Sequence, residues 1–429
     1  MRYVSTRGGG APVALSKAIA NGAAPDGGLY LPETIPAADL AVLTPDLTLA
    51  EFATRLLAPF FAGDPLEAEL GAICAEAFGF PVPLVEALPG LRALELFHGP
   101  TGAFKDFGAR FLMGCFDRLG DAADPLTILV ATSGDTGGAV GRAAEGLAKL
   151  RAVILYPKGR VSPFQELQLT CWRAPVSAIE VDGDFDDCQR LVKAAFADPM
   201  LVAKHRLSSA NSINICRWLP QMAYLAQAAV KLFAETGVKP GLIIPTGNLG
   251  HGFAALYARA MGLPIGPVVL ATNANRTLSD WAANGRYAPH PSVPTIANAM
   301  DVGAPSNFER LMALPEALRA VRAVRVELVE DEAIKARIKA DFAVGYLWCP
   351  HSATGAEAWA RMKPTTQEER PWVVAATAHP YKFAEAIEPL IGEVIMPSPP
   401  LKAILGREGR KSSITSKLEA LEATLDALA

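Results

Sequence analysis

The sequence of 429 residues lacks the features by which several large classes of protein are recognised. Its six cysteines include no Cys-x-x-Cys pair, which argues against a disulfide framework or a zinc site and fits a reducing compartment. Its six histidines show neither HxxxH nor HExxH spacing, so no metal is expected. There is no basic tract, and a formal net charge of −4 argues against nucleic acid as a partner.

Long apolar segments are missing as well. No stretch approaches the roughly 20 apolar residues that span a bilayer. The N-terminal stretch MRYVSTRGGGAPVALSKAIANG has no apolar core of the kind that a secretory signal needs. We therefore expect a cytoplasmic globular protein that does not bind membranes. A chain of this length can form two or three domains with large cores.

What the chain does contain is an alternation of short apolar runs with longer amphipathic stretches. This pattern predicts an α/β fold whose parallel sheets are covered by helices on both faces. The runs that predict buried strands are 126–132, 152–157, 177–183, 241–247, 267–273 and 372–380. Residues 1–90 precede the pattern, a mostly helical segment at about 305–345 interrupts it, and the tail 401–429 ends in a predicted amphipathic helix.

One lysine, Lys105, has unusual neighbours in the stretch HGPTGAFKDFGARF. Small residues precede it, Phe104 and Phe107 flank it, and the nearby charges are Asp106 and Arg110. Two interpretations are open at this point. Lysine is rarely buried without a partner, so Lys105 can belong to a solvated helix face. It can instead be a desolvated amine kept for Schiff-base chemistry, because burial lowers the pKa and frees the nitrogen lone pair.

Two of the predicted strands end in a glycine-rich turn that leads into a helix, SGDTGG at 133–138 and GNLGHG at 247–252. Such a turn, beyond the carboxyl end of a strand, exposes backbone N–H groups to a phosphate or carboxylate. Each turn alone can also be a tight connection without a ligand. Neither fits the dinucleotide or P-loop fingerprint. Two anion sites beside Lys105 suggest a phosphorylated aldehyde cofactor with a second anionic ligand.

The motifs together resemble those of the threonine synthases, a family of fold-type II enzymes that use pyridoxal phosphate. The matching stretches follow the family order over nearly the whole chain: YVSTRG, APDGGLYLP, HGPTGAFKDFGARF, ATSGDTGGA, PKGRVSPFQELQL, VDGDFDDCQ, NSINICRWLPQ, PTGNLGHGFA and ATAHPYKF. The length and the N-terminal block resemble the longer subclass of bacteria and fungi.

The resemblance implies a fold similar to that of the tryptophan synthase β-subunit. It implies an N-terminal subdomain at 1–90, a large cofactor-binding domain at 91–125 and 223–400, a small substrate-side domain at 126–222 and a helical tail at 401–429. The segment at about 305–345 is then an insertion in the large domain.

The resemblance also implies residues that bind pyridoxal phosphate. Lys105 corresponds to the lysine that forms the Schiff base and then serves as general base. Thr377 corresponds to the hydroxyl residue that faces the pyridine nitrogen; without the resemblance it is interpreted as a strand threonine bonded to backbone. Asp135 corresponds to the residue that faces the phenolic oxygen. The cofactor phosphate is expected at the backbone N–H groups of Gly247, Asn248, Leu249, Gly250 and His251.

A second implied set binds the substrate. The substrate carboxylate is expected in the first turn, at Ser133, Gly134 and Thr136. The substrate phosphate is expected at Asn211, Ser212 and Arg217.

For one arginine and two histidines in these motifs, a purely structural role is the simpler interpretation. Arg217 can cap a helix or form a salt bridge instead of binding phosphate. His98 and His251 are expected to pack or to bond locally rather than to transfer protons.

The implied reaction converts O-phospho-L-homoserine and water to L-threonine and phosphate, the last step of threonine biosynthesis, in a monomer or a homodimer. One alternative is another fold-type II activity, such as threonine dehydratase, cysteine synthase or a phospho-lyase. A dehydratase has no need of the phosphate-binding residues around NSINICR. Another alternative is a catalytically silent, metabolite-binding relative, which would not be expected to keep Lys105, Asp135, Asn248 and Thr377.

Overall fold

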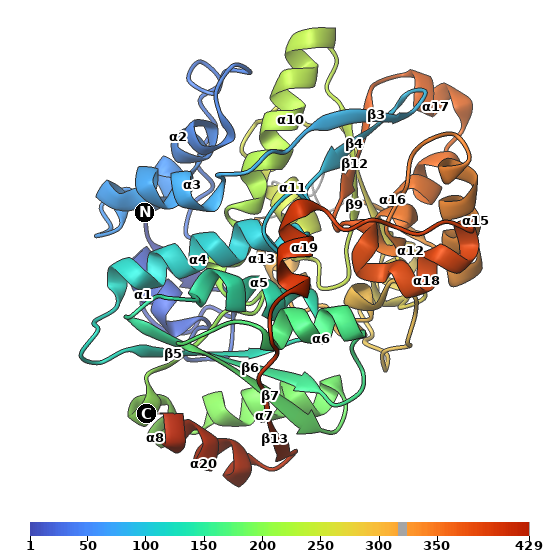
Figure 1. Cartoon of the computed structure of the whole chain (residues 1–429). Helices are drawn as coiled ribbons and strands as arrows, with labels where there is room; N and C mark the ends of the chain where they lie inside the picture. The colour runs from blue at the N-terminus through green and yellow to red at the C-terminus, as the bar shows by residue number, and fades with distance from the viewer. Residues whose placement is uncertain (316–323, 429) are drawn as a thin grey trace.

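The computed structural model describes residues 1–315 and 324–428 and contains two large sheets and one small one. Figure 1 shows the six-stranded sheet in the upper half of the view and the five-stranded sheet in the lower half. Both consist mainly of parallel strands with helices between them, so the predicted α/β class is confirmed. Within the described residues, no helix is long and apolar enough to cross a membrane.

The six-stranded sheet has the strand order β11-β10-β9-β12-β4-β3. Its neighbours are parallel except for β3, which pairs antiparallel with β4 at one edge. Three of the predicted runs form β9, β10 and β12 in its interior, and all three are buried along their length. The strands are β3 (Leu84–Leu88), β4 (Leu91–Glu95), β9 (Gly241–Pro245), β10 (Val268–Thr272), β11 (Arg325–Leu328) and β12 (Trp372–Ala376).

Strand β11 lies inside the segment 305–345, for which the sequence predicts mainly helix. The segment does contain α13 (Phe308–Ala313) and α15 (Asp331–Phe342), and β11 lies between them. The strand was missed because RVEL is short, charged and only partly buried at the sheet edge, so it carries little hydrophobic signal. Residues 316–323 of the same segment lie outside the described residues.

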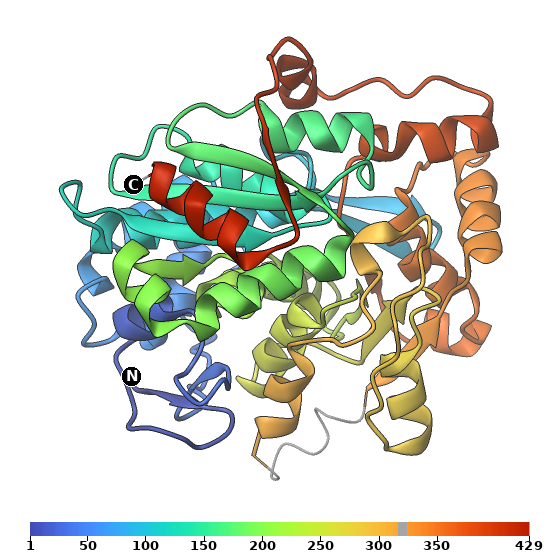
Figure 2. The same ribbon diagram turned by 90° about the horizontal axis from the view of Figure 1, so that it is seen from below.

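The five-stranded sheet has the strand order β13-β7-β6-β5-β8, with every neighbouring pair parallel. The predicted runs at 126–132, 152–157 and 177–183 form three of its strands, and the edge strands β8 and β13 were not predicted. The C-terminal tail supplies β13 and then α20 (Leu418–Leu428), which packs on α7 (Phe185–Ala197), as Figure 2 shows. The strands are β5 (Leu126–Ala131), β6 (Leu150–Pro157), β7 (Val176–Asp182), β8 (Leu207–Ser209) and β13 (Ser412–Thr415).

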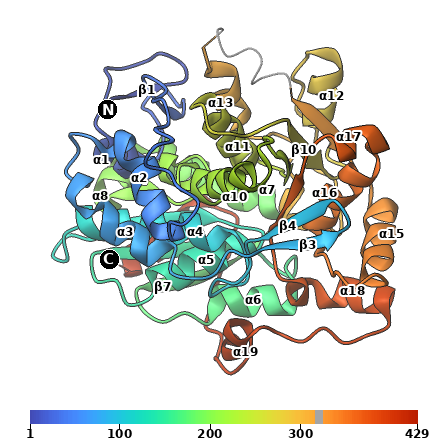
Figure 3. The ribbon, with the colours of Figure 1, turned by 90° about the horizontal axis from the view of Figure 1, so that it is seen from above.

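Helices pack against both sheets. Helices α11 and α16 contact the six-stranded sheet, and α5 and α7 contact the five-stranded sheet. Figure 3 shows α10 near the centre of the molecule, with α15 and α18 at one side. The remaining helices after residue 100 are α4 (Lys105–Leu119), α5 (Asp135–Ala144), α6 (Pro163–Thr170), α8 (Pro199–His205), α9 (Ile215–Trp218), α10 (Gln221–Thr236), α11 (Gly250–Ala260), α12 (Thr277–Asn284), η2 (Asn298–Met300), α16 (Pro350–Ala360), α17 (Pro364–Glu368), η4 (Pro380–Phe383), α18 (Ala384–Ile391) and α19 (Pro399–Leu405).

The N-terminal region forms a two-stranded antiparallel sheet, three α-helices and one short 3-10 helix. Helix α3 packs on α4, and α2 packs on α10, so the region is attached to the helices that follow it in the chain. Strand β3, at 84–88, already belongs to the six-stranded sheet, although the predicted boundary lies at residue 90. The elements are β1 (Tyr3–Ser5), α1 (Leu15–Asn21), β2 (Tyr30–Pro32), α2 (Leu49–Phe61), η1 (Glu67–Glu69) and α3 (Leu70–Ala77).

The chain after β12 folds back onto the loop that precedes α4. The N–H of Phe104 donates to Thr377 O at 2.8 Å, and the N–H of His379 donates to Gly102 O at 2.9 Å. These bonds explain why β12 ends at Ala376, before the predicted end at residue 380. They also place Lys105 beside the carboxyl end of β12.

Candidate active site

Lys105 is the first residue of α4, and its side chain is partly buried. Its Nζ lies 4.6 Å from the centre of the Phe104 ring and makes no ion pair within the described residues. Burial and the nearby Arg217 guanidinium lower the pKa of Lys105 to about 8, and Asp135 opposes this shift. A much larger fraction of this amine is therefore neutral near physiological pH than of an ordinary lysine. The geometry favours the desolvated amine over the solvated helix face.

The second glycine-rich turn leads directly into α11. Leu249 takes the left-handed conformation with φ of 63°, and no side chain caps the helix that begins at Gly250. The first N–H groups of a helix have no partner within the helix, so they remain available to an anion. Asn248 fixes this turn, because its Nδ2 donates to Ser212 Oγ at 2.6 Å and its Oδ1 accepts from the N–H of Ser306 at 2.5 Å.

Gly247 and Gly250 of this turn are needed for different reasons. Neither has a positive φ, so the left-handed position is Leu249 and not a glycine. A Cβ on Gly247 would lie 2.7 Å from Met300 Cα, whereas a Cβ on Gly250 would lie 3.4 Å from Asn307 Nδ2, its nearest neighbour. Gly247 therefore allows η2 to pack against the turn, whereas a Cβ on Gly250 would make only ordinary van der Waals contacts at the helix N-terminus.

This difference predicts separable effects of substitution. We expect Gly247→Ala to lower the free energy of unfolding of the cofactor-free protein by about 1–3 kcal/mol, because the new methyl group overpacks against backbone. Gly250→Val should change that stability less and should weaken anion binding at the turn more. Urea unfolding and a titration with pyridoxal phosphate measure the two quantities. Equal losses of stability and affinity at Gly250 would mean that it is only a turn residue.

The first glycine-rich turn is shaped by a threonine that the sequence motifs did not single out. Thr132 Oγ1 accepts hydrogen bonds from the N–H groups of Gly134 and Gly137, both at 3.0 Å. Gly134 has φ of 141° and precedes α5 without a capping side chain. The hydroxyls of Ser133 and Thr136 form no hydrogen bond within the described part of the chain. The turn thus offers free N–H and O–H groups to a ligand.

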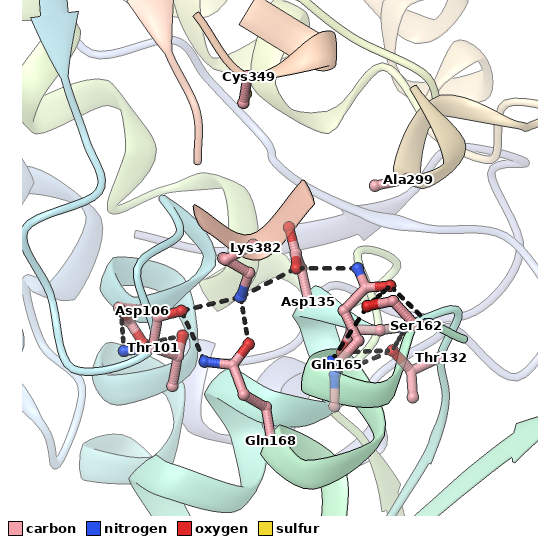
Figure 4. A network of polar contacts seen from close by, with 12 residues as sticks. Thr101, Asp106, Thr132, Asp135, Ser162, Gln165, Gln168, Ala299, Cys349 and Lys382 are labelled. Carbon is pink, nitrogen blue, oxygen red and sulfur yellow. Dashed lines mark hydrogen bonds and ion pairs between the residues drawn. The ribbon is translucent and has the colours of Figure 1, made fainter. Parts of the chain in front are cut away.

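Asp135, the first residue of α5, is buried and pairs with a second lysine. Lys382 Nζ lies 3.0 Å from Asp135 Oδ1, and Figure 4 shows the two side chains meeting. Burial alone would raise the pKa of Asp135, but Lys382, His351 and Lys105 together hold that pKa below its usual value. The carboxylate is therefore ionised. Sequence reasoning missed Lys382, although the residue lies within the quoted motif ATAHPYKF.

Arg217 is buried in α9 beside the start of α4. Its Nη1 donates to Ala210 O, and its Nε is buried without a hydrogen-bond partner. It forms no salt bridge with a described residue and does not cap a helix, so the plainer alternative finds no support. A Cβ on Gly108 would lie 3.2 Å from Arg217 Nε, so this glycine lets the guanidinium approach α4 one turn after Lys105.

The other two residues expected at the substrate phosphate differ in their surroundings. Ser212 accepts the hydrogen bond from Asn248 and so lies next to the second turn. The amide of Asn211 instead donates to Ala131 O at 2.8 Å and holds the end of β5. Arg310, which the motifs did not include, donates to Ser212 O at 3.1 Å and is fully buried. We infer that Arg310 supports this loop rather than a ligand.

The two motif histidines pack or bond locally, as expected. His98 Nε2 lies 2.7 Å from Glu95 Oε2. His251 stacks on Phe104 with 4.6 Å between ring centres, and both of its ring nitrogens are buried without a partner. Burial and Lys105 lower the pKa of His251 to about 3, so its ring is neutral. An unpartnered neutral imidazole at the start of α11 can still donate one hydrogen bond to a ligand.

Thr377 follows β12 and faces α16. Its N–H donates to Ser352 Oγ at 2.9 Å, and its hydroxyl lies 3.4 Å from the same oxygen. Ser352 Oγ in turn lies 3.1 Å from Cys349 Sγ. The hydroxyl of Thr377 therefore contacts a side chain and not backbone, which differs from the alternative interpretation. The sequence motifs did not include Ser352 or Cys349.

The donor set fits a phosphorylated aldehyde. It combines a lysine with a lowered pKa, an uncapped helix N-terminus beside it and two buried side chains, Arg217 and His251, with unpartnered nitrogens. An uncapped helix start suits a phosphate, and an amine that loses its proton readily suits an aldehyde. A second uncapped helix, α5, offers room for another anion.

Comparison with known proteins also indicates an enzyme that uses pyridoxal phosphate. Residues 86–378 match the family described as "Pyridoxal-phosphate dependent enzyme", 2–78 match "Threonine synthase N terminus" and 352–425 match "Threonine synthase, C-terminal". Threonine synthase of Serratia marcescens is 38% identical over 385 residues, 89% of each chain.

Two solved structures agree along the whole length. Threonine synthase from Escherichia coli is similar with a TM-score of 0.91 at 33% identity, covering 100% of both chains. Threonine synthase from Brucella melitensis, in a structure described as bound to PLP, gives a TM-score of 0.91 at 35% identity, covering 100% of this chain and 99% of that one. The chain belongs to the threonine synthase family of pyridoxal-phosphate-dependent, fold-type II enzymes.

Proposed function

We propose that this chain converts O-phospho-L-homoserine and water to L-threonine and inorganic phosphate, with pyridoxal phosphate as its cofactor. The observation that carries the proposal is the setting of Lys105. Its amine, with a pKa of about 8, lies near the buried Arg217, which has no acidic partner among the described residues. A reaction on a phosphorylated substrate needs both a reactive amine for the cofactor and a separate cation for the second phosphate.

The residues that would hold the cofactor belong to four segments of the chain. Lys105 would bind its aldehyde, and the N–H groups from Gly247 to His251 would bind its phosphate. Thr377 and Asp135 would face the ring nitrogen and the phenolic oxygen. When bound, the cofactor supplies a conjugated ring that takes up the electrons left by departing protons.

The chain itself supplies proton transfer and anion binding. Lys105 Nζ, when it is not bound to the cofactor, would take protons from Cα and then from Cβ of the substrate. Phosphate would leave from Cγ, water would add its hydroxyl at Cβ, and Cγ and Cα would each regain a proton. Because His251 is neutral and stacked on Phe104, it would bind and orient rather than transfer these protons.

Arg217 would hold the leaving phosphate together with Ser212. A guanidinium binds two phosphate oxygens at once, and burial strengthens each of these charge-assisted bonds. Ser133 and Thr136, whose hydroxyls bond to no described residue, would hold the substrate carboxylate at the start of α5.

The test is a product analysis with the purified enzyme. With O-phospho-L-homoserine we expect threonine and phosphate in equal amounts. Formation of 2-oxobutanoate without threonine would identify a dehydratase instead. Failure to bind pyridoxal phosphate at all would favour a silent, metabolite-binding relative.

The rate at which the cofactor-free enzyme takes up pyridoxal phosphate should depend on pH through Lys105. Only the neutral amine reacts, so the rate should rise about tenfold per pH unit below the pKa and level off above about 8. The appearance of the yellow absorption band follows the reaction. A rate that keeps rising to the pKa of an ordinary lysine would contradict the lowered pKa of Lys105.

We also propose a cytoplasmic location for the enzyme. All six cysteines are free and buried, which supports a protein adapted to a reducing compartment. Fractionation of the source cells with an antibody against the chain would test this.

A further inference from the structure

Lys382 is a second buried lysine beside the site, and it joins segments from both large sheets. It lies in η4, just after β12, with only 2% of its surface exposed. Its Nζ lies 3.0 Å from Asp135 Oδ1, 2.8 Å from Thr101 O and 2.5 Å from Gln168 Oε1. Figure 4 shows these groups converging on the ammonium. One ammonium therefore links the start of α5 to the loop that precedes Lys105.

Asp135 interacts electrostatically with two lysines but pairs with only one of them. Lys382 forms the ion pair, whereas Lys105 forms no ion pair or hydrogen bond within the described residues. Asp135 and Lys105 interact nonetheless, since Asp135 raises the pKa of Lys105 and Lys105 lowers the pKa of Asp135. His351 also faces Asp135, and its own pKa, lowered to about 4, leaves it neutral near physiological pH.

Asp106, the remaining charged group near Lys382, accepts hydrogen bonds from other groups. Asp106 accepts from the N–H of Thr101 at 2.9 Å and from the Thr101 hydroxyl at 2.7 Å. Gln168 Nε2 donates to Thr101 O at 2.9 Å, so the loop before Lys105 is held independently of the ammonium. The group that depends on Lys382 for its counter-charge is therefore Asp135.

We propose that Lys382 is a positioning residue: it engages Asp135 and thereby leaves the amine of Lys105 free to react with an aldehyde. The inference rests on the proposed function for the role of Lys105. Without Lys382, a buried carboxylate would lack its counter-ion, which is a costly state. Lys105 is the other lysine that interacts with Asp135, and pairing with it would keep Lys105 protonated.

The reaction of Lys105 with an aldehyde shows why the pairing of Lys382 with Asp135 matters. Neutral Lys105 Nζ forms a bond to the aldehyde carbon, the carbon–oxygen bond breaks, and the oxygen leaves as water with both amine hydrogens. A protonated Lys105 must first release a proton to solvent, and a carboxylate paired with it opposes that release. Lys382 thus acts on the reaction only through Asp135.

The test compares Lys382→Met with the double variant Lys382→Met, Asp135→Asn. The measured quantity is the rate constant for uptake of pyridoxal phosphate by cofactor-free protein near neutral pH. We expect the single variant to be slower by about tenfold or more, because a rise of one unit in the pKa of Lys105 removes about nine-tenths of the neutral amine. The double variant should take up the cofactor within about threefold of the rate of Asp135→Asn alone, since Lys382 has no carboxylate left to act through.

A matched control is Lys411→Met. Lys411 also binds α6, through Glu166 at 2.6 Å, but on the solvent side. The substitution Lys411→Met should leave the rate of pyridoxal phosphate uptake unchanged. The thermal midpoint of each cofactor-free variant provides a second readout: it should fall for Lys382→Met and recover in the double variant.

Each outcome decides the inference. An unchanged rate in Lys382→Met, or an equal slowing by Lys382→Met in the presence and in the absence of Asp135, would overturn it. If the single variant does not fold, a folded double variant as fast as Asp135→Asn alone supports the inference, and an unfolded double variant refutes it. A wild type that takes up the cofactor but does not convert O-phospho-L-homoserine would refute the proposed function and leave this rate comparison valid.

Discussion

Replacing Lys105 by alanine is expected to reduce kcat on O-phospho-L-homoserine by about four orders of magnitude or more, because one side chain holds the cofactor and moves the protons. The fold should remain intact. Lys105 forms no ion pair in the part of the chain that the structure describes, and burial lowers its pKa below that of an unfolded lysine. A group with a lowered basic pKa costs stability when protonated, and this cost is largest below about pH 8. The thermal midpoint of cofactor-free Lys105→Ala should therefore equal or exceed that of the wild type.

The control is Lys335→Ala, which removes an exposed lysine paired with Glu332 and should leave kcat unchanged. Borohydride reduction of the wild-type enzyme should fix the cofactor on the peptide that contains Lys105. A label on the peptide of another lysine, Lys382 included, would show that the assignment is wrong. An active Lys105→Ala variant would do the same.

Arg217→Ala is expected to lower kcat/KM for O-phospho-L-homoserine by about two orders of magnitude or more, since loss of one member of a desolvated charged pair costs on the order of 2–4 kcal/mol. The guanidinium is buried, has a free Nε and has no acidic partner within the described residues. Burial lowers its pKa only to about 10, so it remains charged and able to bind a phosphate. Affinity for pyridoxal phosphate should stay near normal, because the second turn does not depend on Arg217.

Inhibition by inorganic phosphate provides the matching readout. It should weaken in Arg217→Ala in parallel with kcat/KM. Arg276→Ala, at an exposed arginine paired with Asp280, serves as the control and should change neither quantity. A variant at Arg217 that keeps wild-type kcat/KM, or that loses the cofactor instead, would exclude a phosphate-binding role.

The predicted strands share one property that explains why they could be predicted. The runs at 126–132 and 241–247 are continuous, apolar and buried on both faces, so they carry their own signal. Strand β13, by contrast, has the exposed polar sequence SSIT and exists because β7 offers a free edge to pair with. Pairing with a partner distant in the chain leaves no local pattern, so β13 and β11 could not be foreseen.

The residues of the site also divide into those that the sequence singles out and those that it does not. Residue types and the resemblance singled out Lys105 and both turns, and their roles toward cofactor and substrate stay predictions. Gly247 was expected only to offer its N–H to the cofactor phosphate, and its close contact with the backbone of Met300 carried no signal in the sequence. Lys382 could not be assigned a role, because its partners Asp135 and Gln168 are more than two hundred residues away in the chain. Contacts of this kind depend on how the two sheets pack.

The central claim is that phosphate leaves from carbon and that water then adds at the neighbouring carbon. The most direct test is turnover of O-phospho-L-homoserine in water labelled with a heavy oxygen isotope (H₂¹⁸O), followed by mass spectrometry of both products. The account predicts that the heavy oxygen enters the hydroxyl group of threonine and that the released phosphate carries none. Heavy oxygen in the phosphate, with homoserine as the other product, would identify simple phosphate-ester hydrolysis and contradict the account.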